Sequence, residues 1–384
     1  MKSLMQWNHL PAAANEWIDR IEALAPLILQ HRDHAEEHGA THPDVMARLF
    51  ELGFSRLCVP RAFGGHQLDI RVISQILQRL AFYDASLSWQ IMVQVAMGRL
   101  ADYLPQATAR TLYGDSQGFV VGAIHPAGEA IEVDGGYRLS GKWGFASGSA
   151  HAHWMVCTST IKQETPTQGK PEVRMFIVPV DQCQMIKTWD TLGMRGTASN
   201  HFQCTNVWVP QAFSLDTALL KAAPAYRESL AYSMGYYDFG TLAAMGTVLG
   251  VAKAALEHFR IGRTVPGDDA VRHLTMDKTG KAVAQVHAAQ LLLEDAIDHC
   301  EQHGTGDGLS VRVGLAASVL NESAVSAVNQ VFALSGASAV YKTHVLERCF
   351  RDIHVGSKHF VLSSMNLHGV GKLYLDSVDT NRIY

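Results

Sequence analysis

A single block of strand-forming sequence, residues 116–213, lies between two long helical segments, and this order limits the possible fold more than any other feature. The block holds short β-rich runs divided by turn signals, and the DGG at 134–136 predicts a hairpin. Apolar positions at helical spacing precede the block, and helices that are apolar on most faces, such as 311–334, follow it. The pattern predicts an α+β protein with an N-terminal helical domain (1–115), a middle β domain (116–213) and a C-terminal helical bundle (214–384).

The composition excludes several classes of function. Hydrophobic residues make up 47% of the 384 residues, charged residues make up 18%, and the net charge is −4, so nucleic acid is not expected as a partner. The six cysteines are scattered without a CxxC pair, which indicates reduced thiols. The chain shows neither an apolar leader nor an uncharged apolar run of about 18 residues. We therefore expect a cytoplasmic protein without a membrane partner.

Residues 141–156, GKWGFASGSAHAHWMV, mix large aromatic rings with glycine, alanine and serine. A core strand would favour Val and Ile throughout, so the mixture favours a flat aromatic ligand that lies against the backbone. A glycine-marked β-bulge is the alternative. His151 and His153 form an H-x-H pair of a kind that can bind metal, but no third ligand follows at a suitable spacing. No metal is therefore predicted.

Four stretches of the chain, taken in their order, resemble the acyl-CoA dehydrogenase superfamily. The resemblance implies an acyl-CoA dehydrogenase-like fold, with a β-barrel as the middle domain and a four-helix bundle at the C-terminus, and it implies a homotetramer. The four stretches are YDASLSW (83–89), GKWGFASG (141–148), WDTLGMRGTASNHFQCTNVWVP (189–210) and ALSGASAVYKTHVLERCFRDIHVGSKH (333–359).

One departure from the dehydrogenases favours a particular branch of this superfamily. A dehydrogenase of the family presents a glutamate just after the Arg-Asp pair of the last stretch, where it removes the α-proton of an acyl thioester. Here His354, Val355 and Gly356 occupy that region, so the proton abstraction has no obvious base. The RDIH followed by KH resembles the two-component flavin-dependent monooxygenases instead.

That branch implies a function with defined partners. The protein would take reduced FAD or FMN from a separate NAD(P)H-flavin reductase, since the chain lacks a GxGxxG fingerprint of its own. Molecular oxygen would be the co-substrate, and a C4a-hydroperoxyflavin would oxygenate a small aromatic or heteroaromatic substrate, for example of the indole type. The alternatives are an FAD oxidoreductase of the acyl-CoA dehydrogenase type and a non-catalytic relative that binds flavin or another ligand.

The resemblance also implies which residues contact the flavin. Trp143 and Phe145 would shape the cavity around the isoalloxazine ring, and the Ser147 hydroxyl would lie near flavin N5 and C4a, where it would act in catalysis. Arg263 matches an arginine that reaches the flavin phosphate of a neighbouring subunit, the alternative being a solvated residue at a helix end. Residues 193–200 could also be only a turn, and small residues near 336 only helix caps. The expected contacts are Trp143, Phe145, Ala146, Ser147, Gly148, Thr197, Ser199, Arg263, Gly336 and Ser338.

Two histidines are candidates for the acid/base group. The resemblance favours His359, with His354 second, and solvated or core histidines are the alternative. On a regular helix, residues five apart diverge by about 140°, so we expect only one of the two to face the flavin. Trp89, Gln94 and Met97 are the expected substrate contacts. Many aromatic hydroxylases of the branch carry a histidine near the position of Met97, and its absence here favours an indole or another heteroaromatic ring over a simple phenol.

Overall fold

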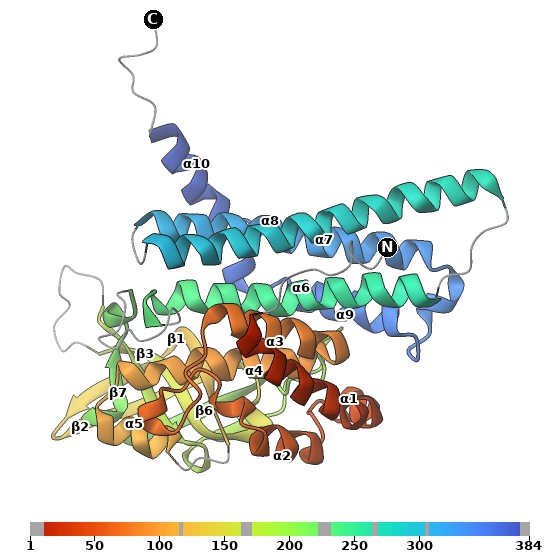
Figure 1. The fold of residues 1–384 in the computed structure, drawn as a ribbon. Helices are drawn as coiled ribbons and strands as arrows, with labels where there is room; N and C mark the ends of the chain where they lie inside the picture. Colours follow the sequence, from red (N-terminus) through yellow and green to blue (C-terminus); the bar gives the residue numbers. More distant parts are fainter. Residues whose placement is uncertain are drawn as a thin grey trace, which may run out of the picture.

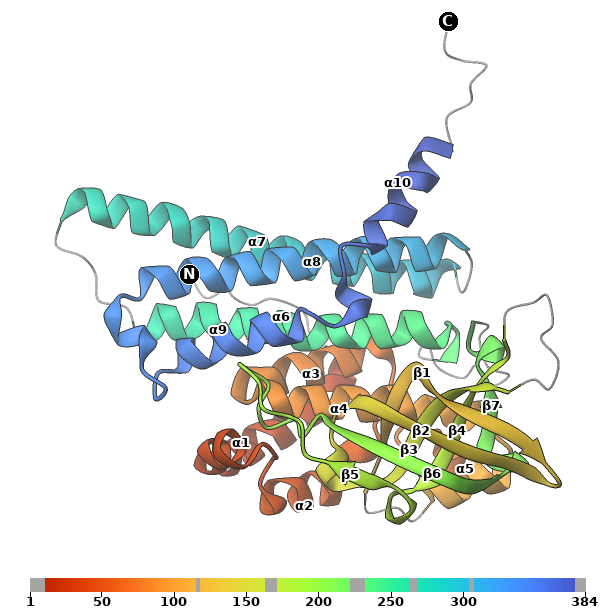
Figure 2. The same ribbon diagram turned by 180° about the vertical axis from the view of Figure 1, so that it is seen from behind.

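The predicted order of helices, sheet and helices is present in the computed structural model, in which a helical bundle lies over a layer made of the sheet and the N-terminal helices (Figure 1). The same layers are visible from behind, where the sheet faces the viewer (Figure 2). The structure describes residues 11–114, 118–162, 171–221, 232–262, 268–303 and 307–376.

Two of the N-terminal helices, α2 and α4, begin at residues whose side chains satisfy a free backbone N–H group of the first helical turn. At the start of α2, His42 Nδ1 accepts a hydrogen bond from Asp44 N, and Pro43 occupies the first helical position. At the start of α4, Asp84 Oδ1 accepts from Leu87 N at 2.9 Å. Helices α3 and α4 pack directly against α6 of the bundle. The helices are α1 (Ala12–His38), α2 (Pro43–Glu51), α3 (Ile70–Tyr83), α4 (Ala85–Gly98), α5 (Gln106–Tyr113) and α6 (Tyr236–Gly262).

The middle of the chain forms one seven-stranded mixed sheet with the order β5-β6-β2-β1-β3-β4-β7. The predicted hairpin is present: Val133 pairs with Gly136 across a turn in which Gly135 adopts a φ of 71°. The order is linear, so within the described strands no ladder joins β5 to β7 to close the expected barrel. The strands are β1 (Phe119–Val133), β2 (Gly136–Ala146), β3 (Ala152–Ile161), β4 (Val173–Pro179), β5 (Gln184–Ile186), β6 (Asn200–Pro210) and β7 (Ser214–Asp216).

Helix α6 is the central element of the C-terminal bundle. It packs on α3 and α4 at one side and on α7, α8 and α9 at the other. Its length and apolar composition would suit a membrane span, but 89% of an apolar stretch of 18 residues within it is buried inside the protein, as in a core helix. Helix α10 projects away from the bundle (Figures 1 and 2). The other helices of this part are α7 (Asp269–His303), α8 (Asp307–Leu334), α9 (Val345–Gly356) and α10 (Asn366–Asp376).

Candidate active site

A cavity of about 560 Å³ lies where the sheet, α4, the start of α6 and the end of α9 meet. Its walls are largely apolar, with polar groups only at a few places. The cavity brings together eight of the residues that the sequence marked as site candidates. They are Trp89, Met97, Phe145, Ser147, Thr197, Ser199, His354 and His359.

Three hydroxyl groups in the cavity wall form a chain with a fixed direction. Thr197 Oγ1 donates to the carbonyl oxygen of Met194 at 2.9 Å. Ser199 Oγ lies 2.7 Å from Thr197 Oγ1 and 2.7 Å from Ser147 Oγ. A hydroxyl has only one proton, so Ser199 must donate to Thr197, and Ser147 must donate to Ser199. Ser147 therefore retains free lone pairs with which it can accept a hydrogen bond from a ligand N–H group.

The backbone beside these hydroxyls is held in conformations that non-glycine residues seldom adopt. Phe145, Met194 and Ala198 have φ values of 61°, 53° and 47°, and all three belong to the segments that carry the hydroxyl chain. Such conformations persist only where the surrounding structure enforces them, and they concentrate at ligand sites. At Phe145 the result is a side chain that is 72% exposed and borders the cavity.

Helix α9 fixes one end of the loop that carries Thr197 and Ser199. The main-chain N–H of Met194 donates to Asp352 Oδ1 at 2.6 Å, and burial raises the pKa of Asp352 to about 7. A Cβ atom on Gly193 would lie 2.3 Å from the carbonyl carbon of Arg351, so only glycine permits this approach. The Arg-Asp pair of the sequence thus positions the cavity wall.

The turn between α1 and α2 fixes the other end of the same loop. Ala40 and Thr197 form an isolated antiparallel β-bridge. Thr41 Oγ1 donates to the Gly196 carbonyl oxygen at 3.4 Å, and Gln90 Nε2 reaches Thr41 Oγ1 at 2.7 Å and the same carbonyl at 3.2 Å. The N-terminal helices therefore take part in shaping the cavity.

His359 presents a buried nitrogen without a hydrogen-bond partner. Its Nδ1 is inaccessible to solvent and has no partner among the described residues. Burial lowers the pKa of His359 to about 4, so the imidazole is neutral at physiological pH. An unpaired buried nitrogen costs free energy, and a ligand that hydrogen-bonds to it would remove that cost.

His354 also borders the cavity, but its ring is already engaged. His354 Nε2 lies 2.9 Å from Asn329 Oδ1, and burial lowers its pKa. Both histidines line the cavity, and the helical angle between them does not apply because α9 ends at Gly356 and His359 lies beyond the regular helix; which of the two faces a flavin stays a prediction. His354 and Lys358 also line a neighbouring open groove of about 780 Å³.

Two of the expected contact residues lie in the core instead of the cavity. Trp143 is fully buried, stacks on Phe202, and donates from Nε1 to the Thr158 carbonyl oxygen at 2.7 Å. Both polar atoms of the Gln94 side chain bind the backbone: Nε2 donates to Ser55 O, and Oε1 accepts from Val120 N. Neither residue lines the cavity, which corrects the expectation for both.

Of the remaining predicted residues, those that the structure describes do not line the cavity either. Ala146 is buried in the sheet, and Gly148, with a φ of 85°, forms the turn that follows it. Gly336 and Ser338 belong to the segment after α8, where Gly336 precedes a short 3-10 helix and Ser338 is exposed. Arg263 lies outside the described residues.

Several wall residues were not singled out from the sequence. Trp189 and Met194 lie within the 189–210 stretch, so the motif itself was a signal for them. Tyr236 and Tyr237 open α6 and reach the cavity only through the packing of that helix against the sheet. No pattern in the sequence marks this contact.

The cavity fits the ring system of a flavin. Its apolar walls suit a flat aromatic body, Ser147 offers an acceptor for a ring N–H, and the neutral imidazole of His359 borders the cavity. Gly144 and Gly356 leave backbone uncovered at the wall, and a Cβ atom on Gly356 would lie 2.8 Å from Met194 Cε. None of the described residues that line the cavity is Asp or Glu.

Comparison with known proteins identifies the family. Residues 21–107 match the acyl-CoA dehydrogenase N-terminal domain, and residues 242–364 match the acyl-CoA dehydrogenase C-terminal domain, which together cover more than half of the chain. The chain belongs to the acyl-CoA dehydrogenase family. This confirms the family and the fold inferred from the four stretches of sequence.

The similar proteins of this family include several oxygenases. The chain is 26% identical to the flavin-dependent monooxygenase oxygenase subunit HsaA of Rhodococcus jostii, over 94% of this chain and all of that protein. It is 26% identical to indole-3-acetate monooxygenase of Pseudomonas putida, over 86% of each chain. The structure of XiaF from Streptomyces, in complex with FADH2 and glycerol, superimposes with a TM-score of 0.83 at 20% identity, covering 95% of this chain and 96% of that one. The resemblance to the flavin-dependent monooxygenase branch is thus confirmed.

Proposed function

We propose that this protein is the oxygenase component of a two-component flavin-dependent monooxygenase. It uses reduced FAD or FMN and molecular oxygen to oxygenate a small aromatic or heteroaromatic substrate, and an indole-type ring is the favoured class. One observation carries the proposal: a largely apolar cavity combines an acceptor hydroxyl at Ser147 with a neutral, unpaired imidazole at His359 and has no carboxylate in its described wall.

The wall residues divide the work between binding and proton transfer. When bound, reduced flavin supplies the activation of oxygen. Ser147 holds a ring N–H proton, because its own proton is committed to Ser199. Trp89, Met97 and Tyr236 exclude water and pack on the aromatic substrate. His359 accepts a proton from the substrate or returns one, as a neutral imidazole can do at neutral pH.

The adjoining groove suits the phosphate-bearing part of a flavin. It shares His354 and Lys358 with the cavity, so the two hollows adjoin. Lys278, Lys281 and Lys358 line the groove, against one carboxylate at Glu322. The excess of positive charge favours an anionic phosphate.

The absence of an acid from the described cavity wall argues against the dehydrogenase alternative. Removal of an α-proton from an acyl thioester requires a base near the flavin, and a carboxylate performs this step in the dehydrogenases that the sequence resembles. The described wall offers hydroxyls, aromatic rings, histidines and one lysine, but no carboxylate. His359 itself contacts Trp89 and is suited to an aromatic substrate.

We also propose which partners the protein has and where in the cell it acts. A separate NAD(P)H-flavin reductase supplies the reduced flavin, and the "oxygenase subunit" in the name of the Rhodococcus relative supports this division of labour. A homotetramer is supported by the projecting helix α10, on which Leu373, Tyr374 and Leu375 are exposed, with Tyr374 at 76%. We place the protein in the cytoplasm, without nucleic-acid or membrane partners.

Single-turnover oxygenation tests the proposed function. The purified protein with chemically reduced FAD or FMN is mixed with ¹⁸O₂ in the presence of indoles and phenols, and product and hydrogen peroxide are quantified. We expect one ¹⁸O atom in the product of at least one aromatic substrate. Conversion of all reducing equivalents to peroxide with every substrate contradicts a monooxygenase. Reduction of bound FAD by an acyl-CoA would establish the dehydrogenase, and failure to bind either flavin would leave the non-catalytic relative.

A further inference from the structure

Four histidines gather on the surface where α1 ends and α2 begins. His31, His34 and His38 follow one another at spacings of three and four residues and so share one face of α1. Gly39, with a φ of 69°, ends the helix, and the chain then reverses its direction. This reversal places His42 next to the same face of α1.

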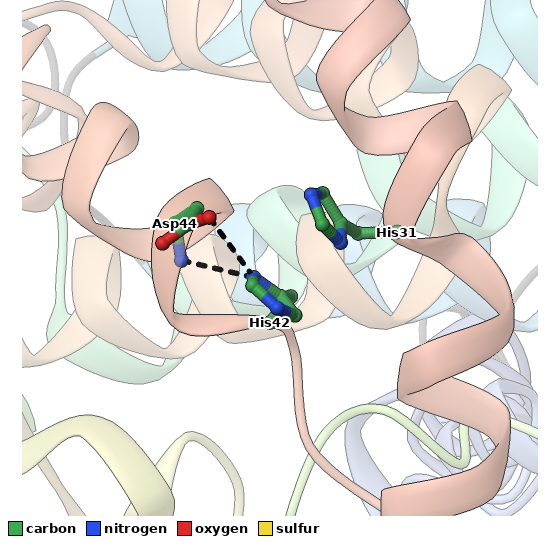
Figure 3. A group of neighbouring side chains, drawn as sticks. All are labelled: His31, His42 and Asp44. Atoms are coloured by element: carbon green, nitrogen blue, oxygen red, sulfur yellow. Dashed lines mark hydrogen bonds and ion pairs between the residues drawn. The ribbon is translucent and has the colours of Figure 1, made fainter.

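The rings of this histidine cluster are in direct contact. The centroids of His31 and His42 lie 3.8 Å apart, those of His34 and His38 lie 4.0 Å apart, and those of His34 and His42 lie 4.7 Å apart. Asp44 adds a carboxylate, with Oδ2 3.8 Å from His42 Nδ1. Figure 3 shows His42 between His31 and Asp44, with dashed lines that join His42 to Asp44.

We propose that His31, His42 and Asp44 form a binding site for a divalent transition-metal ion, with Zn²⁺ as the best match. One ligand atom from each of the three residues lies within 4.8 Å of those of the other two. Around Zn²⁺, ligand atoms at about 2.0–2.2 Å from the ion must approach one another more closely than this. A small rotation of half-buried and exposed side chains achieves the approach, because none of the three is locked in the core.

The chemistry of the donors selects the ion. Two imidazoles and one carboxylate suit Zn²⁺, Ni²⁺ or Cu²⁺, whereas Mg²⁺ and Ca²⁺ require an oxygen shell. His34 contacts His42 and lies one helical turn from His31, but it is not among the three residues whose ligand atoms lie within 4.8 Å of one another. His42 Nδ1 already accepts the hydrogen bond from Asp44 N that caps α2. An ion that binds through Nδ1 must replace this hydrogen bond, so only a strongly coordinated ion would bind there.

The site is separate from the cavity but joined to it through the backbone. None of the four histidines lines the cavity. Ala40 and Thr41, which support the Thr197 loop, lie within the turn whose two sides carry His31 and His42. A bound ion would therefore tie the end of α1 to the start of α2 across this turn, and its role is to stabilise the turn.

Direct metal titration of the full-length protein tests the site. The chelator-treated protein is titrated with Zn²⁺ by calorimetry and with Co²⁺ by visible absorption, which reports coordination geometry. We expect one equivalent of Zn²⁺ per chain, a higher melting temperature on Zn²⁺ addition, and no equivalent response to Mg²⁺. No binding, or a Co²⁺ spectrum of octahedral hydrated ion only, would overturn the proposal.

Three variants locate the ion. His31→Gln and Asp44→Asn should each weaken Zn²⁺ binding at least tenfold, and His42→Asn should do the same while it retains a side chain that can cap α2. The matched control is His299→Ala combined with His303→Ala, a pair of neighbouring α7 histidines whose ring centroids lie 4.5 Å apart. We expect unchanged affinity in this control. Equal loss in the control and in the His31 variant would show that the chain binds metal through surface histidines in general, which would also overturn the site.

Discussion

The ring of His359 meets the indole ring of Trp89 edge-on, with the two ring centroids 5.3 Å apart. His359 lines the cavity, and its Nδ1 atom is buried without a hydrogen-bond partner among the described residues. Burial lowers the pKa of His359 to about 4, so the ring is a neutral base over the whole physiological range. Burial thereby sets the protonation state of the group that we assign to proton transfer, and the ring packs on Trp89.

Replacement of His359 by alanine should slow oxygenation without loss of flavin binding. Loss of a positioned acid/base group costs about 10²- to 10⁴-fold in rate, whereas the other cavity walls remain in place. Flavin affinity by fluorescence and product formation in a single turnover are the measurements. His354→Ala is the matched control, and we expect the smaller loss there because its Nε2 is already bonded to Asn329. If the two variants exchange behaviour, His354 is the acid/base group.

The same pKa predicts the acid side of the pH profile. A histidine with the ordinary pKa of about 6.5 would become protonated, and inactive as a base, between pH 7 and pH 6. Because burial lowers the pKa of His359 to about 4, its contribution to the rate should persist as the pH falls to about 5. The ratio of wild-type to His359→Ala rates, measured from pH 5 to pH 8, should be constant. A ratio that halves near pH 6.5 would show that the imidazole is solvated in the working enzyme.

Ser147→Ala should increase the fraction of turnovers that release hydrogen peroxide. The variant removes the acceptor that we assign to a flavin N–H group, and loss of one such hydrogen bond changes a rate by roughly 5- to 150-fold. The ratio of peroxide to oxygenated product is the measurement. Ser149→Ala is the control, since Ser149 Oγ donates to the Ala198 carbonyl oxygen but does not line the cavity. An unchanged ratio in Ser147→Ala would remove this residue from the flavin site.

Asp352→Asn should remove a pH dependence of stability. Burial raises the pKa of Asp352 to about 7, whereas an aspartate in the unfolded chain titrates near 4. Between these values the folded state binds more protons than the unfolded state, so this group lowers the free energy of unfolding as the pH rises from about 4 to about 7. Asparagine keeps an oxygen that can accept from Met194 N but carries no charge. Urea unfolding should show the variant equal to wild type near pH 4 and more stable at pH 8.

Asp352→Ala is the control for that experiment. It lacks the acceptor for the Met194 N–H, so it should be less stable than Asp352→Asn at every pH. If Asp352→Asn is instead the less stable protein at pH 8, the negative charge itself stabilises the fold, through Arg351.

Hydrogen peroxide should join Cys183 to Cys204. Their sulfur atoms lie 3.4 Å apart, and the β5–β6 ladder that starts with Gln184 opposite Gln203 places the two cysteines opposite each other. Two thiols and one peroxide give one disulfide and two waters, and uncoupled turnover would supply the peroxide. Peptide mapping after peroxide treatment should find this pair linked and reducible by dithiothreitol. Cys183→Ser should abolish the link and Cys157→Ser should preserve it; the reverse result would assign the reactive pair to Cys157.

The sequence predicted the order of the three parts from local patterns, and the family resemblance singled out three hydroxyl residues that the structure brings together in one cavity wall. Their contact with a flavin stays a prediction. Ser147 belongs to one of the four sequence stretches and Thr197 and Ser199 to another, and in the structure their hydroxyl groups are hydrogen-bonded to one another. The resemblance implied that Trp143 and Phe145 both shape the cavity, and alternate residues of a regular strand would share a face. They separate because the β2–β6 register shifts between Trp143 and Ala146, and Phe145 takes a positive φ.

Other features depended on contacts between distant segments. The helical angle between His354 and His359 does not apply because α9 ends at Gly356, and nothing in the local sequence marks that end beyond a single glycine. The wall contributed by Tyr236 and Tyr237 arises from the docking of α6 on the sheet. The spatial pairing of His31 with His42 required the return of the chain at Gly39.

The bridge between Ala40 and Thr197 makes a surface turn of the helical domain a support for the cavity wall. A mutant library restricted to the residues that touch substrate would omit this turn, although any shift of its backbone moves the main chain that carries Thr197 and Ser199. Two homologues with identical lining residues but different turns would then differ in substrate preference. Substrate selectivity in this fold can therefore change through a residue that does not contact the substrate.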